Sequence, residues 1–285
     1  MRQEHNHHNE VDFSARPLLS SATVSIRDVY CSGRCREQSS EECATATELV
    51  FPYRGAFVRH LGSDQAVAEA NQVLFFNPGE GYRVSHPIGG GDASLSLAIS
   101  EELLLELTPT VLLRSGTRAV FQSQRLRIDA RAQALVALLG HSLRQNVAEP
   151  LEAESLALTL VHRALGPRTT HLAGASTARQ RLVDRIKLVL ASDMSRRWTL
   201  SEIAAEVRGS PVYLTQVFQQ VEGMPLYRYQ LRLRLARALD LLAQYEDLTT
   251  LSLDLGFSSH SHFSAAFREA YGQSPSEFRQ SALRR

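Results

Sequence analysis

The sequence predicts an α+β protein of two parts, a β-rich N-terminal half and an all-helical C-terminal half. Three observations predict this fold. The chain has 285 residues, which is long for one domain. Apolar residues recur at every second position in the N-terminal half and at every third or fourth position further on. Near the C terminus, two short helical patterns joined by a glycine-containing turn occur twice.

The N-terminal half is predicted to begin with a flexible tail over residues 1–20. The polar start MRQEHNHHNE is not followed by the apolar core of a secretory signal, and no stretch approaches the roughly 18 apolar residues of a membrane span. We therefore expect a cytoplasmic protein.

Residues 21–115 are predicted to be β-rich. Apolar and polar residues alternate in TVSIRDVYC (23–31) and ASLSLAIS (93–100), as in half-buried strands. Further β-rich segments at 48–62 and 71–87 are separated by glycine-containing turns, which favours a small barrel or sandwich.

Two helices are predicted within residues 116–165, where leucines recur at spacings of three and four. The run GPRTTHLAGASTA at 166–178 is small and polar, as in an interdomain linker, so the C-terminal domain is expected at 179–285.

The C-terminal domain carries the strongest local signals. Thr199 and Glu202 have the spacing of a capping box, and Ser210 with Pro211 marks the start of a second helix, so a helix-turn-helix is expected at about 199–222. A linking helix at 225–243 follows, and the same pattern returns at about 248–271.

Two helix-turn-helix units joined by a rod suggest DNA binding. The second helix of such a unit enters the major groove. A linking helix of roughly 19 residues would span about 28 Å, which approaches the roughly 34–36 Å of one DNA turn. Residues 179–285 carry a net charge of +4 against −3 for residues 1–178, the sign expected for a part that faces DNA. A plain all-α bundle is the alternative.

A family resemblance supports DNA binding over the bundle. The stretch LDLGFSSHSHFSAAFREAYGQSPSEFR resembles the signature of the AraC/XylS family of bacterial transcription regulators, and WTLSEIAAEV with RLRLARALDLL resembles the preceding part of that domain. The match covers about residues 180–280. The resemblance implies a cupin-like β-barrel sensor domain in the N-terminal half, followed by dimerisation helices at 116–165.

Carried onto this sequence, the resemblance places eight residues at the DNA. The first recognition helix would offer Val212, Thr215, Gln216 and Gln219, and the second would offer His260, Ser261 and Ser264, with Arg268 near a phosphate. Glutamine pairs well with adenine in the major groove. Many family members carry arginine where this chain has Ala265, so we expect the first unit to specify sequence and the second mainly to hold the backbone.

Three cysteines lie within thirteen residues of the N-terminal half. Cys31, Cys35 and Cys43 have a C-x3-C-x7-C spacing, which is not that of a zinc ribbon. They are compatible with a zinc site completed by His60 or His86, with a redox-responsive thiol cluster, or with ordinary loop cysteines.

A small-molecule effector, if the barrel binds one, is expected at its mouth. The residues predicted to line that mouth are Phe57, Arg59, Phe75, Tyr82 and Arg83. A cupin metalloenzyme fused to a DNA-binding module is a remote alternative, because NPGEGYRV carries Tyr82 where the resemblance would place a metal-binding histidine. No catalytic residues are predicted.

Together these features predict an AraC-type transcription regulator with an effector, metal or thiol signal in its N-terminal domain. Its expected partners are promoter DNA, RNA polymerase and a second copy of the chain. The alternative is an effector-independent regulator whose N-terminal half is a protein-interaction module.

Overall fold

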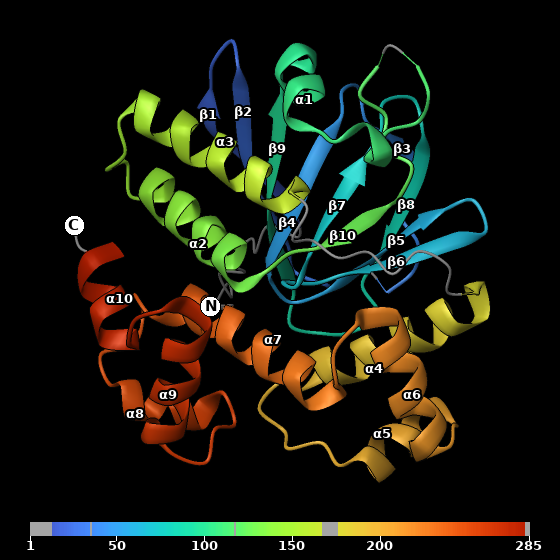
Figure 1. Ribbon diagram of the computed structural model, residues 1–285, viewed down its shortest axis with the longest axis vertical. Coiled ribbons are helices and arrows are strands. Elements are labelled where there is room, and N and C mark those ends of the chain that lie inside the picture. Colours follow the sequence, from blue (N-terminus) through green and yellow to red (C-terminus); the bar gives the residue numbers. More distant parts are fainter. Residues whose placement is uncertain (1–12, 35, 117, 167–175, 283–285) are drawn as a thin grey trace, which may run out of the picture.

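The computed structural model describes residues 13–34, 36–116, 118–166 and 176–282. A β-rich N-terminal part lies on an all-helical C-terminal part (Figure 1). The strands are β1 (Phe13–Ser20), β2 (Val24–Cys31), β3 (Glu42–Cys43), β4 (Glu48–Arg54), β5 (Phe57–Leu61), β6 (Asp64–Ala68), β7 (Gln72–Phe76), β8 (Gly81–Ser85), β9 (Asp92–Ile99) and β10 (Arg125–Arg127). The helices are α1 (Glu101–Leu107), α2 (Ala130–Arg144), α3 (Pro150–Leu165), α4 (Thr177–Ser192), α5 (Leu200–Val207), α6 (Pro211–Glu222), α7 (Leu226–Leu241), α8 (Leu248–Asp254), α9 (His260–Tyr271) and α10 (Pro275–Ala282).

The strands form two antiparallel sheets. One has the order β1-β2-β9-β4-β7-β10 and the other the order β3-β8-β5-β6. The six-stranded sheet packs one face against α2 and α3 through a large apolar core, while Val50, Leu74 and Phe76 on its other face meet the second sheet. Within the described residues the two sheets remain separate ladders and do not close into a barrel, so the structure supports a β-rich domain but not the expected closed barrel.

Two N-terminal segments differ from the prediction. Residues 13–20, expected to belong to the flexible tail, form β1 and pair with β2; residues 1–12 of that tail lie outside the described part. Arg16 and Pro17 obscure the alternation of β1, and proline is tolerated there because the strand lies at the sheet edge, where the register shifts after Pro17. β10 lies within the segment expected to be helical and is too short to show a period.

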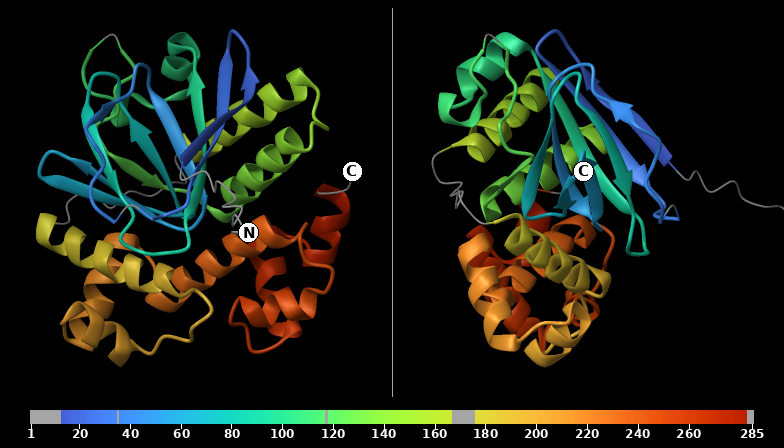
Figure 2. Two further views of the ribbon diagram at one scale, coloured as in Figure 1. Left: turned by 180° about the vertical axis from the view of Figure 1, so that it is seen from behind. Right: turned by 90° about the vertical axis from the view of Figure 1, so that its right-hand side faces the viewer.

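Helices α2 and α3 pack side by side against one face of the N-terminal sheet, and Figure 2 shows them there in two further views. Asp129 caps α2 by accepting from Ala132 N at 2.9 Å and also binds Arg163 of α3. This shared carboxylate joins the two helices. Their predicted role in dimerisation stays a prediction.

The C-terminal helices surround two apolar clusters that share α7. Leu226, Tyr229 and Leu233 belong to the cluster of α4–α6, and Leu235 and Leu239 belong to that of α8–α10. The linking helix therefore serves both helix-turn-helix units. None of the helices in the described ranges is long and apolar enough to cross a membrane.

Candidate DNA interface

The first helix-turn-helix consists of α5 and α6. Thr199 and Glu202 form the predicted capping box, in which the Glu202 carboxylate accepts from Thr199 N at 2.7 Å. The bond from the Thr199 hydroxyl lowers the pKa of Glu202 to about 2. Arg208 then ends α5 in the left-handed conformation, with φ of 54°. This reverses the chain within three residues, so that α6 begins at Pro211.

The second unit repeats this arrangement in α8 and α9. Asp247 caps α8 by accepting from Thr249 N and Thr250 N, and Ser259 caps α9 by accepting from His262 N. These bonds satisfy backbone donors that the first helical turn leaves without partners. Of the two second helices, α9 is thus capped by a side chain at its N-terminal end, the part of a recognition helix that reaches the bases, whereas α6 begins at Pro211 with no side-chain cap from Ser210.

All eight predicted DNA-contacting residues lie on α6 or α9, and none of them is buried: Val212, Thr215, Gln216, Gln219, His260, Ser261, Ser264 and Arg268. The Thr215 hydroxyl donates to Pro211 O at 3.0 Å, and His260 Nε2 lies 3.3 Å from Ser264 Oγ. Gln216 and Gln219 are exposed, which leaves their amides available for base edges. Arg268 pairs with Glu277 at 3.4 Å, but both are more than half exposed, so the pair is weak.

Two exposed tyrosines near α6 were not among the predicted residues. Tyr213 is 48% exposed on α6 and Tyr227 is 66% exposed at the start of α7. The helical period places both aromatic side chains away from the core, and this is the sequence signal that could have identified them.

The linking helix α7 has 16 residues and spans about 24 Å. This is shorter than predicted and shorter than one DNA turn. Arg234, which interleaves with the apolar residues of α7, donates to Met194 O at 2.7 Å and Gly256 O at 3.1 Å. This arginine therefore ties the two helix-turn-helix units together and does not point to DNA.

A buried cluster of charged groups joins the N-terminal half to the first unit. Lys187 on α4 is fully buried and lies 2.5 Å from Glu222 at the end of α6. Tyr229 on α7 donates to Glu69, between β6 and β7. Burial raises the pKa of Glu69, whereas for Glu222 the effect of burial is outweighed by Lys187, which lowers the pKa. Such ions are stable in the interior only while each keeps its partner.

Other contacts extend from the N-terminal half to the rest of the helical domain. Arg54 on β4 donates to both carboxylate oxygens of Asp240 on α7, at 2.9 and 3.1 Å. Ala134, Ala137 and Leu138 of α2 pack against the apolar cluster of α8–α10. The N-terminal half therefore contacts the linking helix α7 and the second helix-turn-helix unit, and through Tyr229 it reaches the apolar cluster of α4–α6.

The residues predicted to bind an effector are mostly packed in the interior. Phe57, Arg59 and Phe75 are buried, and Phe75 stacks on Phe121 with ring centroids 3.7 Å apart. Arg59 donates to Phe75 O at 2.6 Å, and burial lowers its pKa. Tyr82 is half-buried and donates to Glu42, while Arg83 is half-exposed, 3.8 Å from Glu41.

A polar pocket of about 290 Å³ lies elsewhere, between the two halves. Its lining includes Gln65, Gln124 and Arg127 of the N-terminal half together with Gln180 and Glu222 of the helical domain. The buried Oε1 atom of Gln124 accepts no hydrogen bond from the residues that the structure describes. None of the five predicted effector residues lines this pocket.

The predicted zinc ligands are not brought together in the described part of the chain. Cys31 lies beside His86 and Asp92, and not in a group with Cys43 and His60. Cys43 is exposed, and His60 Nε2 lies 2.8 Å from Ser85 Oγ. Cys35 lies outside the described residues.

Comparison with known proteins shows similarity to transcription regulators, above all in the helical domain. A helix-turn-helix domain family matches residues 203–281. The chain is 27% identical over 224 residues to the probable transcriptional regulator LumQ of Photobacterium leiognathi, covering 76% of this chain and 86% of LumQ. It is 34% identical over 107 residues to the transcriptional activator RhaR of Klebsiella pneumoniae, covering 37% of this chain and 38% of RhaR. A solved regulator with an AraC-type DNA-binding domain from Chromobacterium violaceum is 28% identical, covering 38% of this chain and 98% of that one, with a TM-score of 0.36.

Proposed function

The chain belongs, through its C-terminal domain, to the AraC/XylS family of DNA-binding transcription regulators, and we propose that the contacts between its two halves control how it binds promoter DNA. The observation that carries this proposal is that the N-terminal half contacts both the linking helix α7, which both units share, and the apolar cluster of α8–α10. Two recognition helices on one chain read a duplex only in one relative orientation. Whatever shifts the interface therefore shifts DNA affinity.

We place the effector in the polar pocket between the halves. Its volume of about 290 Å³ suits a small polar molecule, and its amide and arginine side chains would donate to the ligand's acceptor atoms. Because Glu222 ends α6 and also lines the pocket, a ligand there would act on the first recognition helix directly. The N-terminal half would then be a cupin-like sensor, although its site is not the predicted mouth of a barrel.

Promoter DNA, RNA polymerase and a second copy of the chain are the proposed partners, and the protein would act in the cytoplasm, where bacterial promoters lie. No catalytic role is proposed for any residue. An effector-independent regulator is the second candidate, and it predicts that no small molecule alters DNA binding.

Base reading by α6 is tested by Gln216→Ala. Duplexes selected from a random library by the full-length protein would be compared with unselected duplexes. We expect the variant to lose roughly tenfold in affinity for the selected sites, the loss of about 1–3 kcal/mol typical of one base contact, and little on random DNA. Gln280→Ala, an exposed glutamine on α10, is the matched control. Equal weakening on both kinds of DNA would show that Gln216 touches only the backbone.

A further inference from the structure

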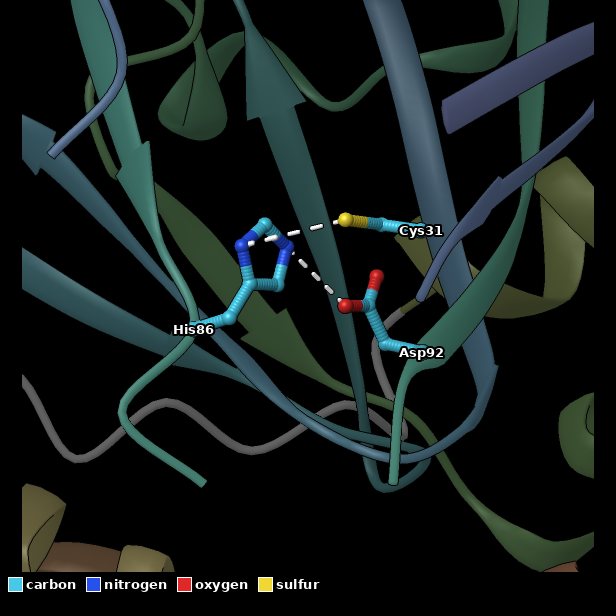
Figure 3. A group of neighbouring side chains, drawn as sticks. All are labelled: Cys31, His86 and Asp92. Atoms are coloured by element: carbon cyan, nitrogen blue, oxygen red, sulfur yellow. Dashed lines mark hydrogen bonds and ion pairs between the residues drawn. The ribbon is translucent and has the colours of Figure 1, made fainter. Parts of the chain in front are cut away.

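Three side chains with metal-binding atoms meet at one end of the N-terminal sheets. Cys31 is the last residue of β2 and Asp92 the first of β9, and the two lie directly opposite each other in the antiparallel ladder. His86 follows the last residue of β8, in the other sheet. Figure 3 shows the three side chains pointing toward one another from these separate segments. The group therefore spans both sheets.

The distances within this group suit a small cation. Cys31 Sγ lies 3.9 Å from His86 Nδ1, and His86 Nε2 lies 3.0 Å from Asp92 Oδ2. One ligand atom from each residue lies within 4.8 Å of the others. Neighbouring ligands of a tetrahedral zinc ion lie about 3.3–3.6 Å apart, given bonds of about 2.0–2.3 Å. The two contacts use opposite nitrogens of the His86 ring, and only one of them can bind a given cation, so the ring must turn as well as the group contract from 4.8 Å to reach that spacing.

The carboxylate of Asp92 provides a second observation. Its side chain is 8% exposed, and among the described residues its buried Oδ2 atom has the His86 ring, 3.0 Å away, as its polar neighbour but no backbone or hydroxyl donor. A buried carboxylate oxygen normally has a donor or a cation as its partner. A bound cation would give this oxygen a second partner beside the His86 ring, whose Nε2 lies 3.0 Å away.

The backbone around the group is held by close glycine contacts. A Cβ atom on Gly91 would lie 2.7 Å from Cys31 O, and one on Gly55 would lie 2.1 Å from Gly91 O. Both glycines have positive φ, 72° and 65°. Only glycine permits this approach, which fixes the strand ends that carry Cys31 and Asp92 before any ligand binds.

We propose that Cys31, His86 and Asp92 form a binding site for a divalent cation of the zinc class. Thiolate, imidazole and carboxylate are the ligand types that zinc combines, and a thiolate disfavours magnesium and calcium. Among the described residues the group offers three ligands, and a tetrahedral ion takes a fourth, such as a water molecule. In the same connection between β8 and β9, Ile88 packs near Leu188 and Ala191 of α4. The cation would therefore fix a loop that contacts the DNA-binding domain.

The test uses the full chain purified without a tag and titrated with Co²⁺, whose bonds to thiolate absorb in the near ultraviolet. We expect one Co²⁺ per chain, displaced by Zn²⁺. Cys31→Ser, His86→Gln and Asp92→Asn should each weaken binding at least tenfold. The matched control is Cys43→Ser, which removes an exposed thiol outside the group and should leave binding unchanged. Thermal unfolding without metal would verify that each variant folds.

Three results would overturn the proposal. Failure to bind Co²⁺ would do so, and the rate of alkylation of Cys31 relative to Cys43 would then show whether the group is a reactive thiol instead. Binding that survives His86→Gln and Asp92→Asn but is lost with Cys43→Ser would identify a cysteine cluster. More than one Co²⁺ per chain with no effect of the four variants would indicate adventitious binding. DNA binding is not used as the readout, so this test is independent of the proposed function.

Discussion

Replacing Arg54 with alanine removes one of the ion pairs between the two halves, Arg54–Asp240. Asp240 is left with a side chain that is only 4% exposed, and it keeps one cation, Arg237. Breaking a buried pair costs about 3–5 kcal/mol, whereas an exposed pair contributes about 0–1 kcal/mol. Because Arg54 is 32% exposed and Asp240 retains Arg237, we expect about 1–2 kcal/mol, which changes an equilibrium by roughly 5–30-fold.

The weaker contact between the two halves should appear as tighter DNA binding. If only the released arrangement fits DNA, the apparent affinity is reduced by the fraction of molecules in that arrangement. Arg54→Ala should then bind selected duplexes up to roughly 5–30-fold more tightly than the native chain, measured by fluorescence anisotropy. Arg83→Ala is the matched control, because Arg83 pairs with Glu41 inside the N-terminal half.

The reasoning would be refuted if Arg54→Ala loosened the interface without tightening DNA binding. Hydrogen exchange of the α7 amides would report the loosening independently. Weaker DNA binding by Arg54→Ala than by Arg83→Ala would show that the interface supports the DNA-binding arrangement instead of opposing it.

The remaining predictions concern stability. Lys187→Met should lower the free energy of unfolding by about 3–5 kcal/mol in urea titrations, because Glu222 loses its buried cation. The control is Arg185→Met, on the exposed side of α4, which should change the free energy of unfolding by less than about 0.5 kcal/mol. Bonds from the Thr250 hydroxyl and from backbone amides lower the pKa of Asp247 to about 2, below its ordinary 3.8. The stability that this cap contributes is therefore present above about pH 4 and lost as pH falls through about 2. The Tm difference between the native protein and Asp247→Asn should shrink as the pH is lowered from about 4 to about 2. A constant difference would mean that the carboxylate charge does not stabilise α8.

The helix-turn-helix units could be predicted from sequence because their determinants are local. Thr199 and Glu202 lie three residues apart, and the apolar residues of α6 and α9 follow the helical period. The partners of Lys187 could not be predicted in this way. It is the chain's sole lysine, but Glu222 lies 35 positions further on and is brought close by the packing of α4 on α6.

The cysteines also show that partners distant in sequence cannot be predicted from a local pattern. Their closeness in sequence suggested that Cys31 and Cys43 share a site, yet Cys31 ends a strand whose register places it opposite Asp92. Register between strands 61 residues apart is set by pairing across the whole sheet and leaves no local mark. The arginines of α7 show that a local pattern can also give the wrong expectation. Arg234 has the spacing of a solvent-facing residue, but its guanidinium satisfies carbonyls at two loop ends.

The most direct test of the account is to sequence genomic fragments retained at near-physiological salt by the full chain and, in parallel, by residues 177–285 alone. The account predicts discrete enriched sites for the isolated domain and the same sites, retained more weakly, for the full chain. Enrichment of no site by either protein would contradict DNA recognition, and equal retention by both would contradict control by the N-terminal half.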